Sequence, residues 1–216
     1  MQPTEIIKIA AIIIALAVAI IGHEIMHGLM AYRYGDDTAK NQGRLSPNPL
    51  LHVDPIGTIV VPALLYFSGG FLFGWAKPVP IYIHTVIRNG GYFGAIAVSL
   101  AGIIYNFTLA LIASLILRIL PSPESLFYFF IHAIFYYLVV LNVVLGVFNL
   151  YPIPPLDGSH ALSYFAAWMG WNGLAKLLDS LNRYGMIILI LIIATPASHY
   201  FFIPMRYLLT LLLPSL

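Results

Sequence analysis

A run of apolar residues, from 9 to 32, contains the motif His23-Glu24-Ile25-Met26-His27 and no other charged residue. A run of this length is long enough to cross the hydrocarbon core of a membrane as one helix. Ionisable groups are costly in hydrocarbon, so they are normally retained there for function. The run therefore predicts a transmembrane helix, over about residues 5–34, that carries a functional polar site.

The spacing of the motif indicates the kind of site. Two histidines four residues apart lie one above the other on a helix face, so both imidazoles can reach one metal ion. Glu24, between them, can take a proton from a water that the metal activates. The alternative is a pair of core histidines bonded to a neighbouring helix, which needs partners for three polar side chains in a dry helix. The motif favours metal-dependent hydrolysis inside a membrane.

The composition supports a membrane protein. The chain is 61% hydrophobic and 8% charged, with a mean hydropathy of +0.92, whereas soluble domains average about 25% charged residues. The net charge of +2, with no basic run, does not favour nucleic acid. The absence of cysteine excludes disulfides and cysteine catalysis. Because the apolar run continues past Ala15-Leu16-Ala17, we expect an uncleaved first helix and not a signal peptide.

Further apolar stretches cover residues 56–75, 92–117, 126–150 and 184–213. The first can span the membrane or re-enter it, because Pro62 and Ser68-Gly69-Gly70 interrupt it. The second begins with many small residues, which suit close contact with another helix. The last is broken at Pro196 and Pro204, so it is either one kinked helix or two shorter ones. A short amphipathic piece is expected over residues 158–171.

Two connecting segments read as irregular. Residues 38–55 are polar and rich in glycine and proline, with short extended pieces expected at 43–46 and 50–53. A loop with His84 and Arg88 is expected up to about Asn89. Together these patterns predict an all-α polytopic membrane protein, residues 1–216 forming one domain, with about four to six transmembrane helices. A short β-rich or re-entrant segment is expected after the first helix.

A catalytic zinc site usually has three protein ligands and one open position, so the motif needs a third ligand. The best candidate is Asp157, which follows three prolines that break a helix and leave backbone able to line a cavity. On local sequence alone, an N-cap role for Asp157 is equally plausible. The weaker alternatives are His160, His52 and Asp54. Three other histidines lack any partnered spacing and are interpreted as interfacial or packing residues: His84, His132 and His199.

Several motifs, in order, resemble the site-2 protease family of intramembrane zinc metalloproteases. The matching segments are Gly22-His23-Glu24-Ile25-Met26-His27-Gly28, residues 43–49, residues 52–58, Phe73-Gly74-Trp75-Ala76-Lys77-Pro78-Val79-Pro80, residues 100–106 and residues 142–158. They cover most of the chain from Gly22 to Gly158. The first motif is moderately specific, and together with the distant Pro-x-Pro-Pro-Leu-Asp-Gly it is strongly specific.

The resemblance implies a role for five residues. It makes His23, His27 and Asp157 the ligands of one zinc ion per chain and Glu24 the catalytic base. It also implies that Asn149 lies beside the active site and binds substrate backbone; the alternative is an ordinary residue at a helix C-terminus.

Asn106 matches a family position to which we assign no catalytic role; a helix–helix hydrogen bond is the alternative interpretation. The chain also departs from the family pattern in three places. Ile103 stands where proline is frequent, Ser159 replaces a frequent second glycine, and residues 84–89 replace the usual Arg-Asn-Pro-Arg-like loop. None of these is a proposed ligand, so the departures affect loop details and not the chemistry.

The function expected from this resemblance is intramembrane zinc endopeptidase activity on single membrane helices that unwind locally. An intact helix holds its carbonyls in hydrogen bonds, so it must open before water can attack. Residues 43–58 are expected to offer a free strand edge to such an unwound peptide. The alternative function is a non-catalytic metal-binding membrane protein or transporter, although Glu24 would then be unexplained.

The expected partners are a transmembrane protein substrate and the lipid bilayer, with no nucleic acid. Many relatives carry a PDZ or CBS domain, for which this chain has no room, so a separate regulatory or adaptor protein is expected to supply such regulation. The expected location is the cell membrane, as a multi-pass protein with the active site toward the cytoplasm.

The orientation can be tested by labelling. Arg33, Lys40 and Arg44 outnumber the lone Lys8 at the other end of the first helix, so the Arg33 end should be cytoplasmic. Since the chain lacks cysteine, a single cysteine at Thr38 gives a clean probe. We expect an impermeant thiol reagent to label it only after the membrane is opened. Labelling of intact cells from outside would reverse the orientation.

Overall fold

The computed structural model describes residues 2–61, 63–64, 74–195 and 198–213, and every regular element in this part of the chain is a helix. In chain order the elements are α1 (Pro3–Arg33), α2 (Thr38–Asn41), the 3-10 helix η1 (Pro49–His52), the π-helix η2 (Pro55–Val60), α4 (Ile83–Ile119), α5 (Leu126–Leu150), α6 (Asp157–Trp168), α7 (Asn172–Asn182), α8 (Gly185–Ala194) and α9 (Ser198–Leu212). The predicted all-α class is confirmed.

Among the described residues, three helices, α1, α4 and α5, are long and apolar enough to cross a membrane, and the chain is a membrane protein. The predicted count of about four to six spans is not confirmed. In the described residues, α8 and α9 have 10 and 15 residues, fewer than the about 20 that a crossing needs. Of the apolar stretch predicted at residues 56–75, residues 62 and 65–73 lie outside the described residues.

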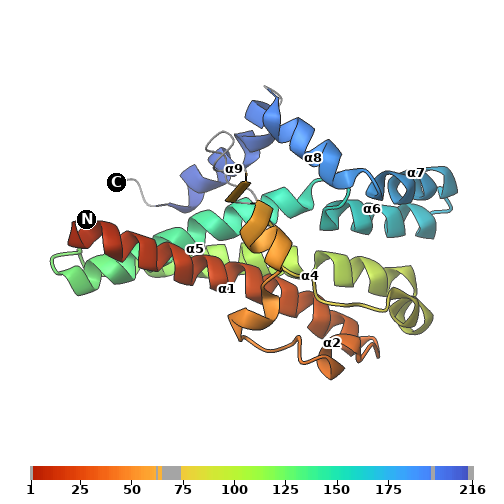
Figure 1. Cartoon of the computed structure of the whole chain (residues 1–216), viewed down its shortest axis with the longest axis horizontal. Coiled ribbons are helices and arrows are strands. Elements are labelled where there is room, and N and C mark those ends of the chain that lie inside the picture. The colour runs from red at the N-terminus through yellow and green to blue at the C-terminus, as the bar shows by residue number, and fades with distance from the viewer. Residues whose placement is uncertain (1, 62, 65–73, 196–197, 214–216) are drawn as a thin grey trace.

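The three long helices form a bundle. Each packs against the other two, and α4 runs antiparallel to α1 and α5 (Figure 1). At one end of the bundle α6 packs on α4, and α7 packs on α6. Helices α8 and α9 follow as two short elements, with α9 against α5. Of the two alternatives expected for the last apolar region, one kinked helix or two shorter ones, the described residues show the two shorter helices.

One row of residues on α1 faces the rest of the bundle. Its members are buried and lie four positions apart: Ala11, Ala15, Ala19, His23, His27 and Ala31. Residues at this spacing form a ridge on the helix surface. The alanines let the neighbouring helices approach closely, and the two histidines occupy the same ridge. The packing of α1 therefore turns the motif inward.

Helix α4 presents small side chains to this ridge, as predicted for residues 92–117. Gly94, Ala95, Ala101 and Gly102 are all buried. The helix begins at Ile83, so the expected loop up to Asn89 is wrong. Its first turns are separated from the long part by Gly91, whose φ of 61° is favourable only for glycine.

Tertiary packing explains why the residues before Gly91 are helical. Val86 is fully buried and packs in one cluster with Ala31 of α1 and Val98 of α4. Burial of such an aliphatic side chain contributes about 1.5–3 kcal/mol. This helix start depends on tertiary contacts, so the local sequence up to Asn89 predicted a loop instead of a helix.

The expected extended pieces at 43–46 and 50–53 are also wrong in the described residues. Gly43, with φ 67°, ends α2 in a left-handed turn, in which its N–H donates to the Lys40 carbonyl and that of Arg44 to the Ala39 carbonyl. Asn48 then starts η1 by accepting from the N–H of Leu50, with Pro49 already fixed near helical φ. Local caps thus favour turns over strands here.

Candidate active site

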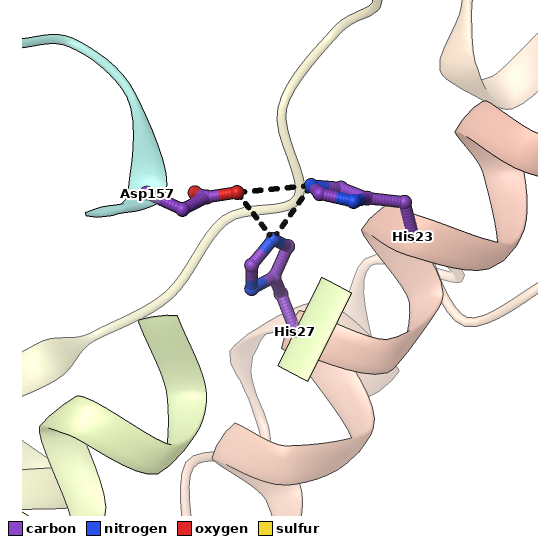
Figure 2. A group of neighbouring side chains, drawn as sticks. All are labelled: His23, His27 and Asp157. Carbon is purple, nitrogen blue, oxygen red and sulfur yellow. Dashed lines mark hydrogen bonds and ion pairs between the residues drawn. The ribbon is translucent and has the colours of Figure 1, made fainter. Parts of the chain in front are cut away.

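The three predicted ligands come together. His23 and His27 project from α1, and Asp157 faces them from the first turn of α6 (Figure 2). Asp157 Oδ2 lies 3.0 Å from His23 Nε2 and 3.3 Å from His27 Nε2, and the two Nε2 atoms are 3.0 Å apart. Both histidines are buried. Among the described residues, His23, His27 and Asp157 form the group of side chains that could hold one metal ion.

Asp157 reaches the histidines because the chain turns sharply after α5. A Cβ on Gly158 would lie 2.2 Å from the Leu150 carbonyl oxygen, so this turn requires glycine. The N-cap position of α6 belongs to Leu156, and the Asp157 carboxylate contacts the histidines. The geometry thus favours the ligand role of Asp157, which the resemblance implied, over the N-cap role that local sequence left equally plausible.

The donor set fits zinc. His27 Nδ1 lies 2.7 Å from the Val98 carbonyl oxygen, which can only accept, so Nδ1 donates, and in the neutral imidazole Nε2 keeps its lone pair. That lone pair faces the Asp157 carboxylate, and such converging electron-rich atoms need a proton or a metal cation between them. A tetrahedral zinc with bonds of about 2.0–2.1 Å would separate its ligands by about 3.3 Å. The observed separations of 3.0, 3.0 and 3.3 Å are close to this value.

Gly102 makes room for His23. A Cβ at this position of α4 would lie 2.6 Å from three atoms of the His23 ring. The small residue therefore has a specific use at the site, besides allowing close packing of helices. The resemblance placed Gly102 in a matching segment without indicating this contact.

Glu24 projects beside the metal group. Its Oε2 accepts a hydrogen bond of 2.8 Å from the N–H of Val79. Pro78 and Pro80 flank Val79 and have no N–H, so Val79 is the donor in this tripeptide. The same segment is tied to the residues after α2, because the N–H of Lys77 donates to the His52 carbonyl and Arg44 donates to the Lys77 carbonyl. These bonds hold the segment against Glu24.

An open cavity of about 350 Å³ is lined by three of the polar groups of the site, Glu24, His27 and Asp157. The residues that line it are Glu24, His27, Pro78, Val79, Ile81, Ile83, Val98, Ser99, Asp157, His160 and Tyr164. Sequence reasoning missed Ser99, Val79 and Tyr164. Tyr164 lies four residues after His160 on α6, and this helical spacing is a signal that points to a shared face.

The remaining candidates lie elsewhere. His52 donates from Nε2 to the Ser46 carbonyl, and Asp54 caps η2 by accepting from Ile56 and Gly57. His132 bonds to the Tyr128 carbonyl of its own helix. Asn149 is at the C-terminal end of α5, where its Nδ2 donates to the Leu145 carbonyl. Among the described residues it is not one that lines the cavity.

Comparison with known proteins identifies the class of protein. The model of peptidase family M50 matches residues 124–193. The chain is 35% identical over 203 residues to a Bacillus subtilis protein named "Putative zinc metalloprotease YwhC", covering 90% of this chain and 84% of that protein. It is 30% identical over 190 residues to the Rip2 protein of Mycolicibacterium smegmatis, which has the same description, covering 86% and 67% respectively. No solved structure matches the chain.

The chain belongs to peptidase family M50, the site-2 protease family. It is a zinc metallopeptidase, and the resemblance found in the sequence is confirmed.

The contact between Gly102 and His23 generates a prediction. Gly102→Ala should weaken zinc binding by at least about tenfold, the range seen when groups that orient a ligand are changed, because the new methyl displaces the His23 ring. Zinc affinity is measured by chelator competition on detergent-purified protein. Gly173→Ala in α7 is the control, since a Cβ there meets nothing within 4 Å. Unchanged affinity in Gly102→Ala would show that the ring is free to move.

Proposed function

We propose that the chain is an intramembrane endopeptidase that cleaves peptide bonds in or near transmembrane segments of other membrane proteins. The observation that carries this is the cavity shared by Glu24, His27 and Asp157, which opens among helices that include two apolar spans, α1 and α4. A protease site in this position meets its substrate at membrane depth. The family membership supports the same conclusion.

Each residue has a part in the proposed reaction. His23, His27 and Asp157 hold the zinc ion, which when bound polarises the scissile carbonyl and makes water more acidic. Glu24 accepts a proton from the attacking water and passes it to the leaving amine. The N–H of Val79, 2.8 Å away, orients the Glu24 carboxylate for this transfer.

The proposed substrate is a membrane helix that opens locally. Its carbonyls are otherwise held in i to i−4 hydrogen bonds and cannot be attacked. Since the described part of residues 43–58 has no strand, the edge expected there is not part of the proposal. Binding of substrate backbone by Asn149 stays a prediction. In the structure its Nδ2 donates to the Leu145 carbonyl of its own helix.

We place the protein in the cell membrane, with the active site toward the cytoplasm. His27 is six residues from Arg33, about 9 Å along the helix, so the metal group lies nearer that end of α1. The positive residues beyond it support this orientation.

The metal ligands are tested by metal analysis. We expect one zinc per chain in the purified protein and none in the double variant His23→Ala, His27→Ala, because two of the three ligands are gone. His132→Ala is the matched control, since this histidine bonds within α5. Stoichiometric zinc in the double variant would place the metal elsewhere.

The role of Glu24 is tested by Glu24→Gln, assayed on a single-span substrate in detergent or vesicles. The amide keeps the shape of the side chain but cannot take the proton, and general-base contributions run to about 10²–10⁴-fold. We expect a loss of that order with zinc content unchanged. Near-normal turnover would remove Glu24 from this role, and absence of cleavage by the unchanged, zinc-loaded protein would favour a binding function.

A further inference from the structure

We propose that two buried asparagines, Asn106 of α4 and Asn142 of α5, fix the tautomer of His23, so that Nδ1 carries the proton and Nε2 faces the metal. They act as positioning residues. The inference rests on the proposed metal site, because it explains how one of its ligands is prepared.

The two amides form a chain of hydrogen bonds that ends at His23. Asn106 Oδ1 lies 2.6 Å from His23 Nδ1, and Asn106 Nδ2 donates to Asn142 Oδ1 at 2.8 Å and to the Ala19 carbonyl at 3.2 Å. Asn142 Nδ2 donates to the Leu138 carbonyl at 2.8 Å. Both asparagines are 0% exposed, so no water competes for these bonds.

Two backbone carbonyls, which can only accept, set the direction of every hydrogen bond in this network. A backbone carbonyl has no proton to donate, so Leu138 requires the NH₂ group of Asn142, and Ala19 requires that of Asn106. If the Asn106 amide were flipped, its oxygen would face the Ala19 oxygen and the Asn142 oxygen. Such a buried arrangement leaves acceptors without donors, which is unfavourable. Asn106 Oδ1 must therefore face His23, and it accepts only if Nδ1 is protonated.

At His27 a single backbone carbonyl fixes the same tautomer. There the Val98 carbonyl of α4 accepts directly from Nδ1, at 2.7 Å. Helix α4 thus orients both histidines of α1, one through its backbone and one through a side chain. With Nδ1 as the donor in both neutral rings, both Nε2 atoms face Asp157 and are left for the metal.

The network also explains why asparagines lie in the middle of an apolar bundle. A buried amide is unfavourable unless its groups are paired, and the Asn106 oxygen and NH₂ group both have partners. The side chain contacts α1 at His23 and Ala19 and α5 at Asn142, so it couples the alignment of three helices to the orientation of one ligand.

The first experiment reads the tautomer directly. ¹⁵N-histidine NMR on the full-length, metal-free protein in detergent distinguishes a protonated Nδ1 from a protonated Nε2, and a His23→Ala sample assigns the signal. We expect Nδ1–H on His23. The Nε2–H tautomer there would overturn the inference, and this measurement needs no variant of either asparagine to fold.

The second experiment measures zinc affinity by chelator competition. Asn106→Leu should raise the zinc dissociation constant about 10–100-fold, as is typical when the partner of a ligating histidine is lost. Asn142→Leu should raise it less than about tenfold, because Ala19 still orients Asn106. Ser114→Ala is the control: Ser114 is buried in α4 but bonds to the Leu212 carbonyl, away from the site.

The outcomes separate the inference from the proposed function. If Asn106→Leu folds and binds zinc within about twofold of the unchanged protein, the asparagine pair does not position His23. If the unchanged protein binds no zinc at His23, the proposed metal site fails, while the tautomer measurement still decides on the hydrogen-bond network.

Discussion

Placing two imidazoles and a carboxylate inside an apolar helix bundle is unfavourable unless each polar atom has a partner. The core of this protein meets that requirement on both sides of the histidine rings. The Nδ1 atoms face oxygen acceptors on α4, and the Nε2 atoms face Asp157. The partners of the rings come from three elements, α1, α4 and α6, so correct packing of these helices and formation of the site are one event.

Small residues make this packing compatible with the chemistry. The alanines spaced four apart on α1 bring α4 within hydrogen-bonding distance of His23, and Gly102 leaves space for its ring. In a membrane there is little hydrophobic force between helices, so close van der Waals contact and buried hydrogen bonds hold the bundle together. The residues that stabilise the bundle and those that prepare the metal group are therefore interleaved on the same helix faces.

Long periodic segments were predicted well, and short irregular ones were not. The apolar stretch at 126–150 agrees with α5, Leu126–Leu150, and the first helix ends near Arg33 as expected. Between them, the region after α2 forms turns and short helices because Asn48 and Gly43 supply caps. Apolar length constrains a helix strongly, whereas a few glycines and prolines are compatible with either strands or turns.

The sequence alone determined the membrane class, the metal-binding motif and the identity of Glu24 as the candidate base, because all three depend on spacing within one helix. Local sequence left Asp157 divided between an N-cap and a ligand, and only the family resemblance favoured the ligand. No role was assigned to Asn106. Those two assignments depend on contacts across 134 and 83 positions of the chain. Only the tertiary structure shows these contacts, since no local pattern specifies which side chains of separate helices meet when the helices pack.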